Sequence, residues 1–169
     1  VPKKKDILLG KSNIENVGGI SFVNIEYNLY HKMNRISKRV FDVIISTFFI
    51  ILFSPFIFIQ TIFGRKIKLD CWGLNNSRLS VIVFDSNNKF IRDLPLLFSV
   101  FVGKISLVGS PMISVEKKDP NLLCLPGITG LERLRNAKFD SNIRQAVEHY
   151  YVQNQNIKLD LEIIIKTIL

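Results

Sequence analysis

The longest hydrophobic segment of the chain runs from Val43 to Phe63 without a charged residue. About 20 apolar residues in a helix are enough to cross the hydrocarbon core of a bilayer. A buried core helix is the alternative, but a run this rich in Phe and Ile is unusual in soluble domains. The pattern therefore predicts a membrane-inserted helix over residues 43–63.

Ser54 and Pro55 lie just past the middle of this segment. Proline removes a backbone donor and clashes with the preceding turn, and a serine hydroxyl can satisfy part of the freed backbone. Basic residues flank both ends of the segment, whereas a spanning helix should have them on one side only. The sequence thus favours a re-entrant helix that breaks at Ser54-Pro55 over a true span. The flanking residues are Lys32, Arg35, Lys38, Arg39, Arg65, Lys66 and Lys68.

Asp42 stands at the mouth of the segment, one turn or less from Lys38 and Arg39. An acid at a membrane interface is usually paired. We expect an ion pair that fixes the entry of the helix, in preference to a lipid-headgroup or metal contact.

The remaining pattern predicts shorter elements. A Gly18-Gly19 turn precedes a strand over 20–25, and a second strand covers 79–84 before a loop at 85–88. Residues 94–102 form an apolar helix or turn, and 104–111 and 126–131 are glycine-bearing loops. Helices follow over 141–154 and 157–169, the last either lying on a membrane or packing in the core. The expected fold is mainly α with minor β, a membrane-associated single domain with C-terminal amphipathic helices.

The chain has 169 residues, a net charge of +9 and 47% hydrophobic residues. A basic and apolar chain points to an anionic membrane surface before it points to nucleic acid. Cys71 and Cys124 have no CxxC spacing, so buried, reduced thiols are favoured over a zinc site shared with His31 and His149. Residues 6–30 contain no apolar segment typical of a secretory signal.

Several segments resemble, in the same order, the bacterial sugar transferases, which are monotopic polyprenyl-phosphate phosphoglycosyl transferases. Lys38-Arg39 followed by residues 40–55 resembles the opening of that family, whose re-entrant helix breaks at a Ser-Pro pair. Residues 94–98 and 103–109 resemble its LPQLxNVLKGxMSLVG block, and 126–131 match its PGITGL. The family's closing pattern is matched by Glu148–Tyr151, Leu159–Leu161, Ile164 and Lys166-Thr167.

The resemblance implies transfer of a sugar-1-phosphate from a UDP-sugar to undecaprenyl phosphate, with release of UMP, in exopolysaccharide or glycan-lipid biosynthesis. It implies a location at the cytoplasmic face of the bacterial inner membrane. In the implied mechanism the Asp of an Asp-Glu pair attacks the β-phosphate of the donor, and Mg²⁺ neutralises the diphosphate. A homodimer or a glycosyltransferase partner stays open.

The sequence departs from the family at the catalytic pair. Anchored on Leu94-Pro95, Arg92 stands at the position of the nucleophile and Asp93 at that of the metal-binding Glu. A guanidinium group stays protonated and cannot attack phosphorus. Asp93 is therefore the candidate catalytic residue, and Asp93 or Asp85 the candidate metal ligand. The family's Lys-Phe-Arg-Ser and Gly-Pro-Arg-Pro motifs are also altered, to residues 83–86 and 109–112.

Polar residues near these motifs are the candidate substrate contacts: Arg92, Lys104, Ser110, Arg133 and Arg135. The arginines among them are suited to a polyprenyl phosphate headgroup, and a solvated face is the alternative. Whether the chain is an enzyme is left open by the sequence. One hypothesis is an active transferase with a rearranged site; the other is an inactive membrane-docked relative, or pseudoenzyme, that binds a lipid phosphate or a partner protein.

The resemblance divides the chain into residues 1–31, a linker or the remnant of an upstream domain, and a transferase-like domain over 32–169. The first residue is Val, which fits either a non-standard start or a fragment. The sequence identifies neither the sugar nor the oligomeric state.

Overall fold

The computed structural model describes residues 12–17, 20–25, 27–117, 121–134 and 141–168. Within them the chain is mainly helical, with three two-stranded sheets. In chain order the elements are β1 (Ser12–Val17), β2 (Ile20–Ile25), η2 (Asn28–Tyr30), α1 (Lys32–Phe63), β3 (Lys66–Trp72), η3 (Leu74–Asn76), β4 (Arg78–Phe84), α2 (Lys89–Asp93), α3 (Leu96–Val102), β5 (Ser106–Val108), β6 (Gly127–Thr129), α4 (Leu131–Leu134), α5 (Ser141–Asn154) and α6 (Ile157–Ile168).

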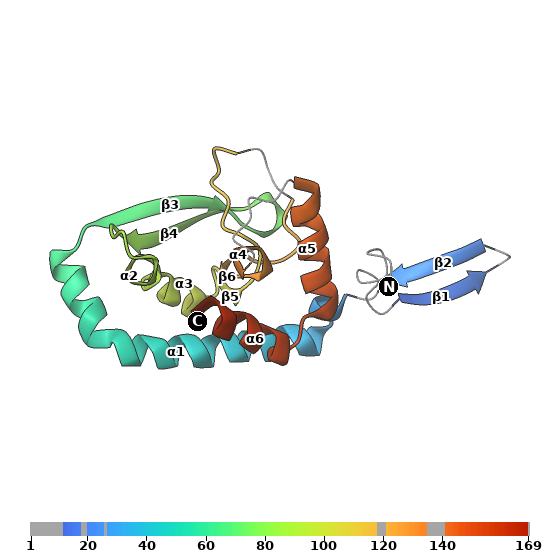
Figure 1. Cartoon of the computed structure of the whole chain (residues 1–169), viewed down its shortest axis with the longest axis horizontal. Helices are drawn as coiled ribbons and strands as arrows, with labels where there is room; N and C mark the ends of the chain where they lie inside the picture. The colour runs from blue at the N-terminus through green and yellow to red at the C-terminus, as the bar shows by residue number, and fades with distance from the viewer. Residues whose placement is uncertain (1–11, 18–19, 26, 118–120, 135–140, 169) are drawn as a thin grey trace.

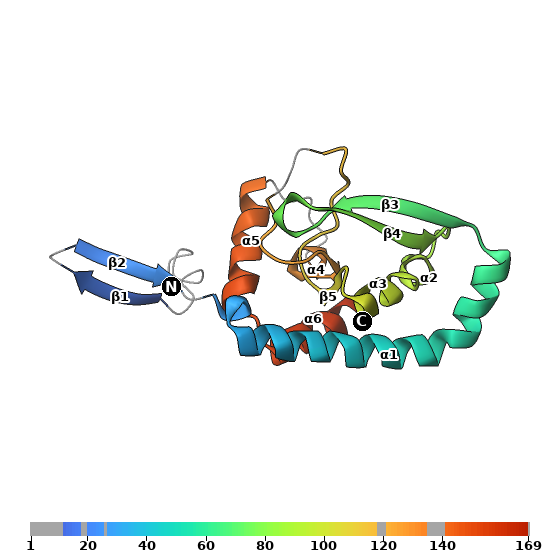
Figure 2. The ribbon, with the colours of Figure 1, turned by 180° about the vertical axis from the view of Figure 1, so that it is seen from behind.

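α1 is one continuous helix with Pro55 in its interior. It extends along one whole side of the domain, and its last turns bend toward the β3–β4 hairpin (Figures 1 and 2). Interior proline is an established cause of helix bends. The break expected at Ser54-Pro55 is therefore a bend inside a continuous helix, and both residues are exposed.

The amphipathic pattern of α1 is inverted relative to a helix of a soluble domain. Its side facing the protein includes Lys38, Asp42 and Ser46, all buried. Its outer side exposes large apolar residues at helical spacing. Only 17% of its most apolar window is buried, and the helix is long and apolar enough to cross a membrane. The exposed residues are Met33, Ile36, Val40, Ile44, Phe48, Ile51, Leu52, Phe58, Ile59, Ile62 and Phe63.

Buried polar contacts hold α1 against the rest of the domain. Lys38 Nζ lies 3.9 Å from Asp42 Oδ1, which confirms the expected ion pair, and 3.2 Å from Asp160 Oδ2 of α6. Ser106 Oγ of β5 donates to Asp42 at 2.6 Å. Tyr151 of α5 donates to Asp160 at 2.7 Å, and burial raises the pKa of this phenol. These contacts join four elements at the start of the apolar segment.

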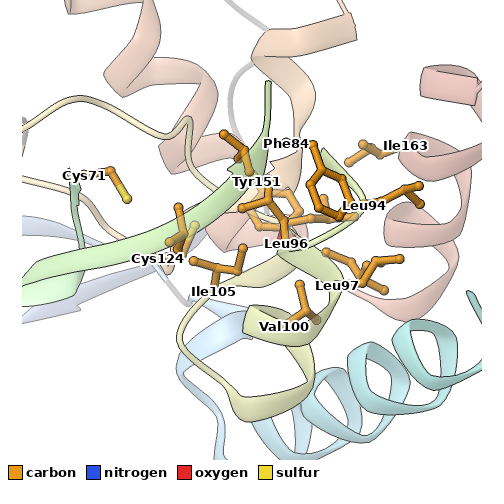
Figure 3. Close-up of a cluster of buried hydrophobic side chains, with 14 of the residues drawn as sticks. Cys71, Phe84, Leu94, Leu96, Leu97, Val100, Ile105, Cys124, Tyr151 and Ile163 are labelled. Atoms are coloured by element: carbon orange, nitrogen blue, oxygen red, sulfur yellow. Dashed lines mark hydrogen bonds between the residues drawn. The ribbon is translucent and has the colours of Figure 1, made fainter. Parts of the chain in front are cut away.

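The hydrophobic core lies between α1 and the β3–β4 hairpin. Leu94, Leu96, Leu97 and Val100 come from the end of α2 and from α3, and Figure 3 shows them meeting Ile163 and the neighbouring strands. Pro95 precedes α3, where a missing N–H costs little. At its other end, Gly103 adopts φ 93°, and Arg39 donates to the carbonyls of Val100 and Phe101 at 2.6 Å.

β5 and β6 are a parallel pair formed by the two glycine-bearing segments. A Cβ on Gly127 would lie 2.3 Å from the backbone N of Gly109, and one on Gly130 would lie 2.4 Å from the carbonyl O of Gly109. Only residues without a side chain allow this approach. The sequence predicted loops here, and the short strands were missed because their pairing is set by distant contacts.

Other predicted elements compare as follows. The strands at 20–25 and 79–84 and the helices at 94–102, 141–154 and 157–169 are confirmed, with β4 starting at Arg78 and α6 ending at Ile168. β1, β3, α2 and α4 were not predicted. The Gly18-Gly19 turn lies outside the described residues. Cys71 and Cys124 are buried free thiols, as expected.

Candidate functional site

A cavity of about 650 Å³ opens between α1, α2, α4 and α6. One wall is apolar and includes Phe49 and Phe53 of α1, inside the segment predicted to enter the membrane. The lining also includes charged side chains, namely Lys89, Asp93, Arg133 and Lys166. Phe90 of α2 packs edge-on against Phe53, with ring centroids 5.1 Å apart. The lining of the cavity thus combines apolar side chains with several cations.

Local sequence places Asp93 at the cavity. Asn88 caps α2 by accepting from the backbone N of Phe90 at 2.9 Å. α2 has only five residues and ends at Asp93, two residues before Pro95. Leu94, next in the chain, is 3% exposed in the core and anchors this end. Asp93 is itself only 8% exposed.

Both oxygens of the Asp93 carboxylate are ion-paired. Arg92 Nε lies 3.0 Å from Oδ1, and Arg133 Nη2 lies 2.7 Å from Oδ2. Arg133 also donates from Nη1 to the carbonyl O of Ile128, which fixes its guanidinium group to β6. The carboxylate is therefore neutralised from two sides by charge-assisted hydrogen bonds.

The cavity has more positive than negative charge. Lys166 lies 2.6 Å from Glu162, an exposed residue on the same helix. Lys89 is exposed and has no acidic partner within ion-pair distance among the described residues. With Asp93 as the only carboxylate among the lining residues described, the cavity suits an anionic group attached to an apolar chain.

The residues present do not fit the Mg²⁺ ion that the family resemblance implies. Magnesium is usually bound through one or two carboxylates together with substrate phosphates and water, and the carboxylate of Asp93 is already paired with two guanidinium groups, whose positive charge opposes a cation. Asp85 is exposed after β4 and does not line the cavity. Within the described part of the chain, no group of three or more His, Cys, Asp or Glu side chains could hold a metal.

Other residues singled out in the sequence lie away from the cavity. Lys104 is exposed after α3. Ser110 is buried, where it bonds to Glu148 and lies 3.0 Å from Cys124 Sγ. Lys38 and Arg39, expected at the membrane surface, are held by Asp160 and by the end of α3. Arg135 lies outside the described residues.

Sequence reasoning missed three members of the cavity wall. Lys89 had been assigned to no motif, and Phe49 and Phe53 were considered only as lipid-facing residues. Lys166 stands out in the sequence only as part of the family's closing pattern, without a link to Arg133. A helical wheel of α1 combined with the position of Asp93 could have suggested Phe49 and Phe53, which lie one turn apart.

Comparison with known proteins points to one protein family. The sequence profile of the family described as "Bacterial sugar transferase" matches residues 87–169, which contain α2 to α6 and most of the cavity wall. Residues 87–169 thus carry the sequence pattern of the bacterial sugar transferase family.

Two curated relatives agree with this family. An "Uncharacterized sugar transferase" of Haemophilus influenzae is 32% identical over 101 residues, covering 55% of this chain and 21% of that protein. A "UDP-glucose:undecaprenyl-phosphate glucose-1-phosphate transferase" of Klebsiella pneumoniae is 24% identical over 208 aligned residues, covering 94% of this chain and 45% of that protein. This chain thus spans less than half the length of either relative. The relatives and the apolar helix together indicate association with a membrane.

Proposed function

We propose that this chain is a membrane-docked member of the sugar transferase family that binds a polyprenyl phosphate without transferring a sugar phosphate to it. The observation that carries the proposal is the cavity, whose lining combines Arg133, Lys89 and Lys166 with Phe49 and Phe53. Cations bind the phosphate, and the apolar wall leads the isoprenoid chain toward the membrane. The name of the Klebsiella relative includes the same lipid class.

The fold supports docking from one side of the membrane. β3 follows the apolar helix and packs in the same domain as later segments of the chain: Trp72 N donates to the carbonyl O of Ile113 at 2.9 Å. At the other end of the helix, Lys38 is paired with Asp160 of α6. Because both ends join one folded unit, this arrangement supports a helix that enters and leaves the membrane on one face. We assign that face to the cytoplasm, because basic flanks favour the cytoplasmic side.

The absence of transfer is argued from Asp93. Each oxygen of Asp93 lies within 3.0 Å of a guanidinium nitrogen. These charge-assisted hydrogen bonds weaken the carboxylate as a nucleophile, although each oxygen keeps a second lone pair. Arg92 cannot replace it, because guanidinium does not become a nucleophile at physiological pH. The site therefore keeps the means to hold a phosphate, whereas its one candidate nucleophile is weakened by two guanidinium groups.

Transfer by Asp93 alone is the competing function. It is favoured by one observation, the presence of Asp93 in the cavity wall beside three cations. This function would use a UDP-sugar as donor and place the chain in exopolysaccharide or glycan-lipid biosynthesis. A homodimer or a glycosyltransferase partner stays a prediction for either function.

The test has two measurements on protein in phosphatidylcholine nanodiscs. The first is UMP release from a panel of UDP-sugars with undecaprenyl phosphate and Mg²⁺, for wild type and Asp93→Asn. The second is binding of undecaprenyl phosphate to wild type, Arg133→Gln and the matched control Arg78→Gln, whose guanidinium lies on β4 over Trp72. We expect no UMP release, and lipid binding that is lost only in Arg133→Gln. UMP release that disappears in Asp93→Asn would establish the transferase instead.

A further inference from the structure

The two arginines that pair with Asp93 differ in their exposure and in their other contacts. The Arg133 side chain is 33% exposed, lines the cavity and is fixed to the carbonyl of Ile128. The Arg92 side chain is 42% exposed and does not line the cavity. Asp93 lies between them and contacts each guanidinium with a different oxygen. One donor of Arg133, Nη2, is thus already occupied by a carboxylate of the same chain.

We propose that Asp93 is an internal competitor for the anion site, which a ligand phosphate displaces from Arg133 when it binds. The proposal rests on the function proposed above and assigns a role to Asp93 other than nucleophile or metal ligand. It makes the site autoinhibited and independent of Mg²⁺.

The exchange leaves no charge uncompensated. When a phosphate oxygen takes the Nη2 donor of Arg133, Asp93 Oδ1 keeps its contact with Arg92 Nε. Arg133 keeps its second contact with Ile128, so its guanidinium stays in place. Lys89 and Lys166 in the same wall add positive charge around the incoming group. Arg133 is therefore the ligand-binding residue, and Arg92 the positioning residue that holds the displaced carboxylate.

Competition by Asp93 predicts an effect of its replacement opposite to the effect that a catalytic role predicts. If Asp93 competes, replacing it by the isosteric Asn removes a negative charge from the site and tightens phosphate binding. If Asp93 were a nucleophile or held Mg²⁺, the same change would abolish turnover or weaken binding in the presence of the metal. One variant thus separates the roles by the direction of its effect.

The experiment titrates farnesyl phosphate into protein in phosphatidylcholine nanodiscs, with empty nanodiscs as background. Variants are Asp93→Asn, Asp93→Ser and Arg133→Gln, each checked for an unchanged unfolding midpoint. The matched control is Asp70→Asn, which makes the same charge change on β3, outside the cavity wall. Dodecyl phosphate and inorganic phosphate test what the chain of the ligand contributes, and farnesol tests what the phosphate contributes.

We expect Asp93→Asn and Asp93→Ser to bind farnesyl phosphate about threefold to tenfold more tightly than wild type, as for removal of one like charge from a partly solvated site. Asp70→Asn should match wild type, farnesol binding should not respond to Asp93, and EDTA should change nothing. Equal gains for dodecyl phosphate would identify the phosphate as the group recognised. Weaker or unchanged binding by both Asp93 variants, or loss of wild-type binding in EDTA, would overturn the proposal. Absence of binding to wild type and to both Asp93 variants would overturn the proposed function itself.

Discussion

At the scale of single residues, Ser110 is a structural residue of this chain. It is 3% exposed, and its hydroxyl donates to Glu148, which also accepts from the backbone N of Leu123 at 2.8 Å. This bond connects the segment after β5 to α5. The sequence suggested a substrate contact because Ser110 falls in the altered Gly-Pro-Arg-Pro motif, but the hydroxyl is directed into the interior.

Replacing Ser110 by Ala should therefore destabilise the fold without affecting ligand binding directly. The change leaves one buried carboxylate oxygen of Glu148 with a single donor, at a cost of about 1–3 kcal/mol. Urea unfolding in detergent, followed by the fluorescence of Trp72, measures the difference. Ser80→Ala is the control, because Ser80 bonds to Asp70 on an exposed strand, and it should change stability by less than about 0.5 kcal/mol. Equal effects of the two variants would contradict the structural role of Ser110.

Cys124 gives the stability a dependence on alkaline pH. Burial raises the pKa of its thiol to about 12, whereas a thiol in an unfolded chain titrates near pH 8.5. The stabilisation is complete below the unfolded pKa and is lost as pH rises toward the folded one, because the unfolded state releases its proton first. Between about pH 9 and pH 11 the free energy of unfolding should fall by about 1 kcal/mol per pH unit more than in Cys124→Ala. Parallel slopes in the two proteins would contradict this assignment.

At the scale of elements, the parallel pair β5–β6 depends on glycine. A Cβ on Gly127 would meet backbone atoms of Gly109 and Thr129 at 2.3 and 2.6 Å, and backbone atoms cannot rotate away. Gly127→Ala should cost about 3 kcal/mol through forced separation of the strands. Gly73→Ala is the matched control, since its new Cβ would meet the side chains of Ser77 and Leu79, which can move. The two unfolding midpoints measure the contrast, and a smaller loss for Gly127→Ala would contradict it.

How far the elements follow from sequence depends on the range of the contacts that define them. The later part of α1, residues 43–63, was predicted because it is a charge-free apolar run long enough to cross a bilayer, and α3, α5 and α6 also followed from local sequence. β3 had a readable signal as well, since Ile67, Leu69 and Cys71 alternate with charged residues, but the signal was overlooked. β5 and β6 had none, because strands of three residues become visible only through their pairing.

The candidate site shows the same limit. The motif alignment drew attention to Arg92, Asp93 and Arg133 as separate candidates, and left the role of each open. Their arrangement as a carboxylate between two guanidinium groups required α2 and α4 to be placed side by side. An ion pair between residues forty positions apart, such as Asp93 and Arg133, cannot be read from local composition. The structure, rather than the sequence, therefore argues against a free nucleophile.

At the scale of the whole molecule, the outer surface matches a bilayer on the side of α1. α6 lies beside α1 (Figure 1) and exposes Ile157, Leu161 and Ile165, one turn apart, while Asp160 and Ile163 face inward. α3 adds Phe98, Phe101 and Val102, with exposed fractions of 46–68%. An apolar surface of this extent, built from several elements, is typical of a membrane or protein interface. It gives the predicted amphipathic C-terminal helix an outward apolar stripe as well as a buried face.

The topology of this surface can be tested by labelling on both sides of the apolar helix. Arg35 and Lys68 are exposed residues near its two ends, and Phe58, 66% exposed, lies inside the predicted membrane segment. Single cysteines at these positions, in inner-membrane vesicles of either orientation, are treated with a membrane-impermeant maleimide. The unmodified chain gives the background, which should be low because both native thiols are buried.

Because β3 and α6 belong to one folded unit, Arg35→Cys and Lys68→Cys should both react in inside-out vesicles and neither in right-side-out vesicles. Phe58→Cys should react in neither, since lipid covers it. Labelling of Arg35→Cys and Lys68→Cys from opposite sides would require α1 to span the bilayer and would separate β3, with Cys71, from the core that contains Cys124. Reaction of Phe58→Cys in inside-out vesicles would instead place the apolar surface in water, where its exposed Phe and Ile side chains have no physical explanation.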